Sequence, residues 1–309
     1  MKQECTLLRL PLQFPFEQYG YRLDKVLNNK NRWDKKIVSS VWDENLRRYV
    51  FTTYKQRSDY QEFIKTSALL KNNNKIAPKI YKVYPEHNTV SCEHIGEFLS
   101  EYMLSNPENL ALVLISVFEY LKDINSMNRQ QGFFNIPSIV KSSLQLSKEL
   151  MCGFELLPCS SSTLFRLEKS NMHFLYGYGI EDPYIWNFRI NKTPGKIQAF
   201  TTDLDYFTET ENCFWELGYF YSSFRWFKKI SAPLACEAER ILLSFIEDTD
   251  LESEFMFWLG ALSSYCGYKD SMLDCVIKGN NIQLKKEYQT IQHLDKKVAY
   301  LADKLLLAR

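Results

Sequence analysis

Three polar side chains in the second half of the chain have the types and spacing that phosphoryl transfer requires. Asp182 and Asn187 stand five positions apart in DPYIWN, and Asp203 follows in TTDLDYF. Phosphoryl transfer needs hard oxygen ligands for magnesium, a carboxylate near the attacking hydroxyl and cations on the phosphates. These three side chains could supply the oxygen ligands and the carboxylate.

A short hairpin is predicted to position these side chains. The β-like runs IWNFRI and KIQAFTTD are separated by NKTPG, in which proline and glycine together are strong turn formers. The loop that enters the hairpin carries Asp182 and Asn187, and its second strand ends at Asp203. All three side chains are therefore expected at the same end of the sheet.

Upstream of this hairpin, the sequence predicts a small antiparallel sheet with one helix. Residues 35–55 form two β-rich runs around WDENLRR, and IYKVY and TVSCEHI form a second pair around PEHN. Residues 58–71 begin with N-capping residue types and carry apolar side chains at roughly helical spacing. This pattern indicates a helix between the two predicted hairpins.

Beyond Gly96 the pattern becomes helical. The run LALVLISVFEYLKDINSM is apolar on more than one face and contains neither glycine nor proline, which is typical of a buried core helix. Residues 129–175 indicate only a short helix in IVKSSLQLSKEL and a serine-rich break. From Cys213 onward the chain is aromatic and helical in pattern, and it ends in a charged helix.

Composition and charge narrow the class of protein. The 309 residues are 45% hydrophobic and 24% charged, which favours a globular protein of two lobes or two small domains. Because 38 basic residues nearly balance 37 acidic ones, we expect neither a nucleic-acid partner nor a membrane partner. The eight cysteines form no CxxC pair, which disfavours a zinc site and, with the absence of a signal-peptide pattern, indicates a cytoplasmic protein.

In order and spacing, these features resemble the protein-kinase-like superfamily, and within it the aminoglycoside and choline phosphotransferase branch. The catalytic-loop pattern D-x-x-x-x-N is matched by Asp182 and Asn187, and the metal-binding Asp of D-F-G is matched by Asp203. The resemblance implies that Asp182 orients or deprotonates the acceptor hydroxyl, and that Asn187 and Asp203 hold magnesium. Asp205 replaces the glycine, as in the D-F-D form of lipopolysaccharide and sugar kinases, and would add a third carboxylate.

The same resemblance assigns nucleotide-binding residues upstream. The run YVFTTYK resembles the strand whose lysine holds the ATP phosphates, which nominates Lys55, with Glu62 of the following helix as its ion-pair partner. The segment CEHIGEFLSEYM resembles the interlobe hinge of the small-molecule kinases. Glu93, His94 and Ile95 would there present backbone groups to adenine.

The resemblance covers residues 35 to about 225 and implies an α+β, bilobal fold. Residues 1–95 would form a sheet-based N-lobe that binds the nucleotide phosphates, and residues 96–309 a mainly helical C-lobe with the catalytic loop and the acceptor site. The implied function is magnesium-assisted transfer of the γ-phosphate of ATP to a hydroxyl of a small molecule. An amino sugar, a sugar and a choline-like alcohol remain alternatives for that acceptor.

The segment WELGYF takes the place of an Asp-Leu-Ala segment that supports the catalytic loop, with Glu216 replacing the aspartate. Two departures from the family pattern keep a second function open. Ile180 stands where the family usually has histidine, and no glycine occurs between Gly20 and Gly96 to form a phosphate loop. The alternative is a pseudokinase, a nucleotide-binding or protein-interaction module that has lost transfer and would have a protein partner. Transfer of AMP, or phosphorylation of a protein, has no specific signal in the sequence.

Other polar and aromatic features have simpler explanations. Glu181 is more typical of a solvated loop charge than of a second acid, and His94 and His173 are more typical of hinge or core histidines than of catalytic bases. The run FWELGYFYSSFRWF has the helical spacing of a core helix, and GYG at residues 177–179 is too short for a phosphate loop. The sequence indicates neither the choice between ATP and GTP nor the oligomeric state.

Overall fold

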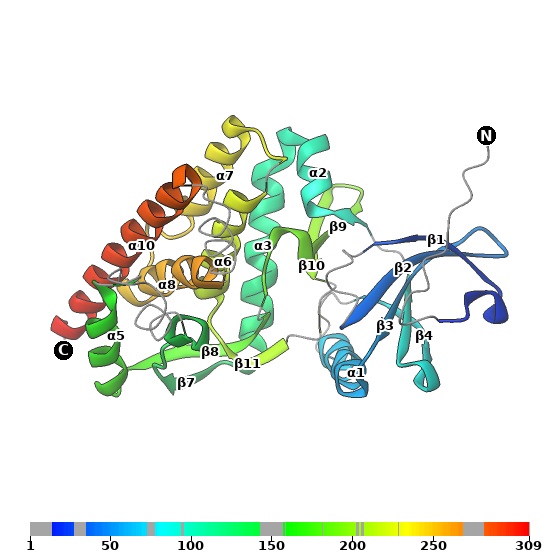
Figure 1. The fold of residues 1–309 in the computed structure, drawn as a ribbon, viewed down its shortest axis with the longest axis horizontal. Helices are drawn as coiled ribbons and strands as arrows, with labels where there is room; N and C mark the ends of the chain where they lie inside the picture. Colours follow the sequence, from blue (N-terminus) through cyan, green and yellow to red (C-terminus); the bar gives the residue numbers. More distant parts are fainter. Residues whose placement is uncertain are drawn as a thin grey trace. The chain divides into compact units, whose positions relative to one another are not determined.

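The chain folds into two compact units. The computed structural model describes residues 14–27, 35–72, 78–93, 96–142, 157, 159–180, 182–201, 204, 207–227, 229–267 and 281–308. One unit consists of Met1–Glu97 with Phe200–Asp205, and the other of Phe98–Ala199 with Tyr206–Arg309. An antiparallel sheet dominates the first and helices dominate the second, which confirms the predicted α+β class (Figure 1).

The first unit is built around a five-stranded sheet in the order β1-β2-β3-β5-β4, in which each neighbouring pair is antiparallel. Its elements are β1 (Tyr21–Val26), β2 (Lys36–Asp43), β3 (Arg48–Tyr54), α1 (Arg57–Asn72), β4 (Ile80–Tyr84) and β5 (Thr89–Glu93). Both predicted hairpins and the predicted helix between them are confirmed.

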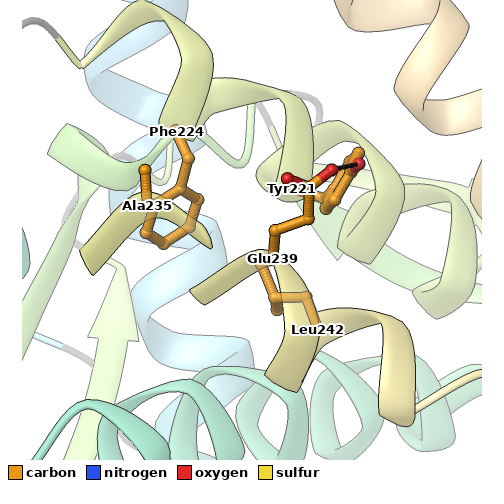
Figure 2. Close-up of a pocket in the computed structure, with 5 residues that line it drawn as sticks. All are labelled: Tyr221, Phe224, Ala235, Glu239 and Leu242. Atoms are coloured by element: carbon orange, nitrogen blue, oxygen red, sulfur yellow. Dashed lines mark hydrogen bonds between the residues drawn. The ribbon is translucent and has the colours of Figure 1, made fainter. Parts of the chain in front are cut away.

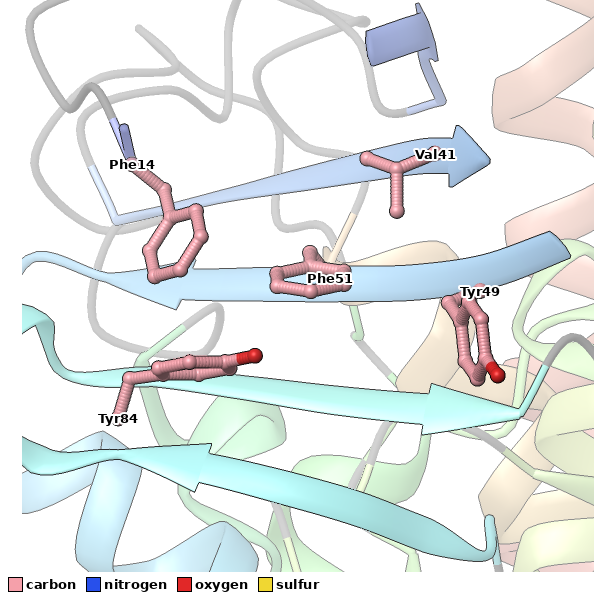
Figure 3. Close-up of a cluster of buried hydrophobic side chains, with 5 residues drawn as sticks. All are labelled: Phe14, Val41, Tyr49, Phe51 and Tyr84. Atoms are coloured by element: carbon pink, nitrogen blue, oxygen red, sulfur yellow. The ribbon is translucent and has the colours of Figure 1, made fainter. Parts of the chain in front are cut away.

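Successive side chains of β3 point to opposite faces of this sheet, and the two faces pack against different parts of the chain. Tyr54 points to the face that α1 covers, where its ring lies 6.0 Å from that of Phe63. Tyr49 and Phe51 point to the opposite face and pack there with Val41 and Tyr84, all nearly fully buried (Figure 3). The segment before β1 covers this second face, because Phe14 inserts its ring among them.

The second unit contains most of the helices. They are α2 (Leu99–Ser105), α3 (Leu110–Asn125), α5 (Ser160–Lys169), α6 (Cys213–Trp226), α7 (Ala232–Ser244), α8 (Leu251–Gly267) and α10 (Asn281–Leu307). Among the described residues, no helix has the length and apolar character to cross a membrane.

Helices α6 and α8 pack closely against each other. A Cβ at Gly218 of α6 would lie 1.8 Å from the backbone oxygen of Phe257 in α8, so only glycine permits this approach. The aromatic run of α6 is largely core, with Leu217 and Phe220 fully buried. Helix α10 packs on both α8 and α5.

Two three-stranded sheets complete the fold. One has the order β10-β9-β6 and the other β11-β8-β7. The strands are β6 (Glu97–Phe98), β7 (Gln130–Phe133), β8 (His173–Ile180), β9 (Phe188–Thr193), β10 (Lys196–Thr201) and β11 (Phe207–Glu211). The predicted β9–β10 hairpin is confirmed, with its turn at Gly195 in the left-handed region at φ 75°.

Residues 129–175 contain more regular structure than the sequence indicated. Strand β7 and the start of β8 lie there, and the serine-rich break is the beginning of α5. Of the short helix expected in IVKSSLQLSKEL, only residues up to 142 lie in the described ranges, and those are helical.

Candidate active site

The loop between β8 and β9 carries Asp182 and Asn187. The backbone N–H of Tyr184 donates to the Asp182 carbonyl at 2.8 Å, and that of Asn187 donates to the Tyr184 carbonyl at 2.9 Å. A turn of 3₁₀ helix, Ile185–Asn187, then leads into β9. These local bonds fold the five-residue spacing into a compact turn.

The structure brings the Asp182 and Asn187 side chains together. The Asn187 Nδ2 donates to the Asp182 carbonyl at 2.7 Å and lies 3.4 Å from the Asp182 Oδ2. Asn187 is 8% exposed, and Asp182 is half-buried. Because the amide nitrogen is directed to Asp182, the side-chain oxygen is the Asn187 atom that could bind a cation.

Helix α6 contacts this loop through hydroxyl groups. The Ile185 N–H donates to the Ser223 hydroxyl at 3.2 Å, and the hydroxyls of Tyr184 and Tyr219 lie 2.9 Å apart. The Tyr184 ring also stacks on Trp186 with centroids 4.6 Å apart. Sequence reasoning treated this part of α6 only as core, although the alternation of serine and tyrosine with apolar residues was a usable signal.

The residue before the loop is held by Glu216 of α6. Its Oε1 accepts a hydrogen bond from the backbone N–H of Ile180, and its Oε2 has no hydrogen-bond partner among the described residues. Glu216 is completely buried, and burial raises the pKa of its carboxyl well above the usual range, while the Ile180 bond lowers it. The Ile180 side chain is itself buried at 1% exposure.

Gly179 is required for this approach of β8 to α6. A Cβ at position 179 would lie 2.4 Å from the Glu211 Cβ and 2.9 Å from the Glu216 Cδ. The GYG segment therefore lets the strand pack closely against its neighbours.

Lys55, Glu62 and Glu93 all belong to the first unit. Lys55 directly follows β3, is exposed, and its backbone N–H donates to the Lys35 carbonyl at 2.8 Å. The Glu62 carboxylate lies 3.7 Å from the Lys65 ammonium, and within the described part of the chain it forms no ion pair with Lys55. Glu93 is the last residue of β5, opposite Tyr49.

The remaining nominated residues lie outside the described residues. They are the hinge residues His94 and Ile95 and the carboxylates Asp203 and Asp205. Strand β10 ends at Thr201, just before the two carboxylates in the sequence. Their proposed roles stay predictions.

A small cavity lies between α6 and α7 (Figure 2). Its volume is about 50 Å³, and its wall consists of Tyr221, Phe224, Ala235, Glu239 and Leu242. The Tyr221 hydroxyl donates to the Glu239 Oε1 at 2.5 Å. None of the nominated residues lines it, and it is much smaller than the several hundred Å³ typical of a nucleotide-sized site.

Comparisons with known proteins identify the fold. No protein-family model and no curated protein matches the chain. Among solved structures, a choline/ethanolamine kinase family protein from Mesorhizobium loti matches with a TM-score of 0.58 at 11% identity, over 91% of this chain and 92% of that one. The chain has the fold of the small-molecule kinases.

Two aminoglycoside phosphotransferases support the same kinase-like fold. A GDP complex of a mutant aminoglycoside 2'-phosphotransferase matches with a TM-score of 0.55 at 12% identity, over 90% of this chain and 93% of that one. A thermostable APH(4)-Ia mutant, in ternary complex with AMP-PNP and hygromycin B, matches with a TM-score of 0.54 at 11% identity, over 93% and 96%. At such identities the likeness shows the fold alone.

The kinase-like fold implies a magnesium site, and the donor chemistry near Asn187 suits that ion. Magnesium prefers hard oxygen ligands, which an amide oxygen and carboxylates provide. In the described ranges, no three His, Cys, Asp or Glu side chains gather as a metal cluster. Asn187 fits as one ligand because its side-chain oxygen could bind a cation. The other nominated ligands are Asp203 and Asp205, which lie outside the described residues.

Proposed function

We propose that this chain is an ATP-dependent phosphotransferase that acts on a hydroxyl of a small molecule. The observation that carries the proposal is the contact between Asp182 and Asn187 on a kinase-like fold, with Ile180 just before it held by Glu216. A carboxylate and an amide side chain on one hydrogen-bonded turn supply the groups that acceptor activation and metal binding need.

In the proposed reaction, the acceptor hydroxyl oxygen forms a bond to the γ-phosphorus, and the bond from that phosphorus to the β,γ-bridging oxygen breaks. ADP leaves, and the hydroxyl proton passes to the Asp182 carboxylate. Asn187, Asp203 and Asp205 would hold Mg²⁺, which would supply neutralisation of the phosphate charge. Lys55, supported by Glu62, would bind the phosphates, and Glu93, His94 and Ile95 would bind adenine.

The neighbours support a small acceptor. Their names refer to choline, ethanolamine and aminoglycosides, and two of the structures hold GDP or AMP-PNP. These are properties of those proteins, and for this chain they favour a small-molecule acceptor and a purine nucleotide. A screen of metabolites for ATP consumption would identify the acceptor.

The first prediction concerns nucleotide binding and turnover. Mg-ATP is expected to raise the unfolding temperature of the wild type, because a ligand that binds only the folded state stabilises it. Asp203→Ala should weaken that shift through loss of a metal ligand. Asp182→Ala should retain the shift but lower turnover by roughly 10²-fold or more, because it removes a positioned base.

Asp248→Ala is the matched control for turnover, because Asp248 is an exposed aspartate of the second unit. It should bind and turn over ATP like the wild type. Turnover that survives Asp182→Ala unchanged would refute the role of Asp182. A wild type that shows no shift with Mg-ATP would refute nucleotide binding altogether.

The pseudokinase alternative is favoured by one structural observation, namely that Glu62 is paired with Lys65. A lysine without its carboxylate partner would hold the phosphates less well in the transfer geometry. A chain that binds Mg-ATP but consumes none with any acceptor would support this alternative over the phosphotransferase.

A further inference from the structure

The cavity between α6 and α7 has a wall of mainly apolar and aromatic side chains with one acid among them (Figure 2). Tyr221 and Phe224 of α6 and Leu242 of α7 are buried, whereas Ala235 and Glu239 of α7 are half-buried. The buried residues therefore form the floor of the cavity, and its α7 side reaches solvent. A ligand can enter from that side.

The polar groups of this wall accept hydrogen bonds. The Tyr221 hydroxyl donates its hydrogen to the Glu239 Oε1 at 2.5 Å. An ionised carboxylate has about four lone-pair sites and no donor, and a phenol oxygen whose hydrogen is in use can only accept. The side chains of Phe224, Ala235 and Leu242 contain no polar atom. The wall thus suits a ligand group that donates hydrogen bonds and disfavours a carboxylate or a phosphate.

Charge and size define that group further. The Glu239 carboxylate attracts a cation, and aromatic rings such as those of Tyr221 and Phe224 attract one through their π faces. The cavity volume is about 50 Å³. Because a cavity of about 150 Å³ holds one benzene molecule, this volume accommodates roughly two or three non-hydrogen atoms. An ammonium group with one or two carbon atoms meets all of these conditions.

The cavity lies on the face of α6 that is turned away from the Asp182 loop. The contacts of this helix with the end of β8 and with the loop come from Glu216, Tyr219 and Ser223. At about 100° per residue, Tyr221 and Phe224 lie roughly 140° around the helix from the centre of that group. A ligand in the cavity would therefore not occupy the candidate active site.

We propose that the cavity between α6 and α7 binds the ammonium group of a small primary amine. The ammonium group donates hydrogen bonds to the Glu239 carboxylate and lies against the rings of Tyr221 and Phe224. The rest of a larger amine would extend past Ala235 into solvent. This site goes beyond the proposed phosphotransfer, because it needs neither a nucleotide nor a hydroxyl on its ligand.

Ethylammonium chloride is the probe for the test, because it carries the ammonium group and has no hydroxyl to phosphorylate. Two-dimensional NMR of the backbone amides follows its titration into the full chain. Shifts should concentrate in residues 221–224 and 235–242 and saturate with a Kd on the order of 1 mM, as expected for a ligand of few atoms. Ethanol, which is similar in size but uncharged, should bind roughly tenfold more weakly. Sodium chloride at the same concentrations controls for ionic strength.

Three variants change the wall. Glu239→Gln keeps the shape of the side chain but removes its charge, and it should weaken ethylammonium roughly tenfold. Tyr221→Phe keeps the ring but removes the hydroxyl that orients the carboxylate, and it should weaken ethylammonium by less. Ala235→Leu fills the cavity, and it should abolish the saturable shifts in a chain at least as stable as the wild type.

Glu237→Gln is the matched control, because Glu237 is an exposed acid of the same helix that pairs with Arg240 at 2.6 Å and is not one of the five wall residues. It should leave the affinity unchanged. Thermal unfolding of every variant checks that it is folded. If Ala235→Leu is not, Glu239→Gln and Tyr221→Phe decide the matter.

Three results would overturn the proposal. Wild-type shifts that do not saturate, or that sodium chloride reproduces, would show that no amine occupies the cavity. Saturable binding that a folded Ala235→Leu variant retains would place the amine elsewhere. An affinity that Glu239→Gln leaves unchanged, or ethanol that binds as tightly as ethylammonium, would show that the cavity does not select an ammonium group.

Discussion

Glu216 shows how one buried acid can fix the position of the Asp182 loop. Its Oε1 accepts the Ile180 N–H, two residues before Asp182, and it reaches β8 because position 179 is glycine. A backbone N–H at the end of a strand needs an acceptor when it is buried, and Glu216 supplies it. Glu216 thus holds the end of the strand that leads into the Asp182 loop.

Substitution of Glu216 should separate its hydrogen bond from its charge. Glu216→Gln keeps an acceptor for Ile180 and should fold with nearly wild-type stability, whereas Glu216→Ala leaves a buried N–H unpaired and should cost about 1–3 kcal/mol. Urea denaturation at neutral pH measures both. Glu252→Ala is the control, because Glu252 accepts the Leu175 N–H of the same strand at an exposed position and should cost less.

The raised pKa of Glu216 also predicts a pH dependence of stability. The folded chain retains a proton that the unfolded chain releases above the usual value of 4.5, so the free energy of unfolding should fall as pH rises through this range. Glu216→Gln carries no such proton, and its stability should vary less between about pH 5 and 8. Parallel curves for the two proteins would contradict a protonated Glu216.

At the scale of elements, Asp295 joins the C-terminal helix to α5. It is a fully buried residue of α10, and its two carboxylate oxygens accept the backbone N–H groups of Cys159 and Ser160 at 2.8 and 2.9 Å. These groups belong to the beginning of α5, where unpaired N–H groups and the helix dipole favour a negative charge. A side chain 135 residues away in sequence therefore caps this helix.

Removal of this cap should destabilise the second unit strongly. Asp295→Ala is expected to lower the free energy of unfolding by roughly 3–5 kcal/mol, because two charge-assisted bonds to buried donors are lost. Chemical denaturation measures it. On the same helix, Asp303 makes an exposed 3.4 Å ion pair with Arg166 of α5, and Asp303→Ala should cost below about 1 kcal/mol. Equal losses would contradict the capping role.

At the scale of the whole molecule, the two units have separate cores. The first unit buries Phe51, Tyr84 and their neighbours under the segment before β1, with Phe14 at the end of the cluster away from Val41 and Tyr49 (Figure 3). The Phe14 ring lies 4.8 Å from Tyr84 and 5.1 Å from Phe51. Helices α6 and α8 form the core of the second unit.

Truncation of Phe14 should therefore act on one unit. Phe14→Ala is expected to cost about 3–5 kcal/mol, as for other fully buried phenylalanines. Hydrogen exchange should accelerate at the amides of β2, β3 and β5 and remain unchanged in α6 and α8. Uniform acceleration would show that the two cores are coupled. Phe16→Ala, at a half-buried position beside Phe14, should have a smaller effect in the same strands.

Much of the element order could be predicted from the sequence. Local alternation, helical spacing and turn residues predict the hairpins β2–β3, β4–β5 and β9–β10, the helix α1 and the core helix α3. The structure confirms these elements. Strands β7, β8 and β11 were missed. Strand β7 pairs with β8 across 40 to 46 positions, and β11 pairs with β8 across 27 to 34, so local sequence carries little of their signal.

For the candidate site, the five-residue spacing of Asp182 and Asn187 was readable because both side chains stand on one loop. The structure added the contacts of the Asn187 amide nitrogen with the Asp182 carbonyl and carboxylate. Only the tertiary structure decided three other contacts, which are those of Arg189 with the Phe98 ring, Glu216 with the Ile180 N–H and Asp295 with the start of α5. Each contact joins residues that lie 36 to 136 positions apart, in an apolar environment that strengthens it, and no local sequence pattern predicts it.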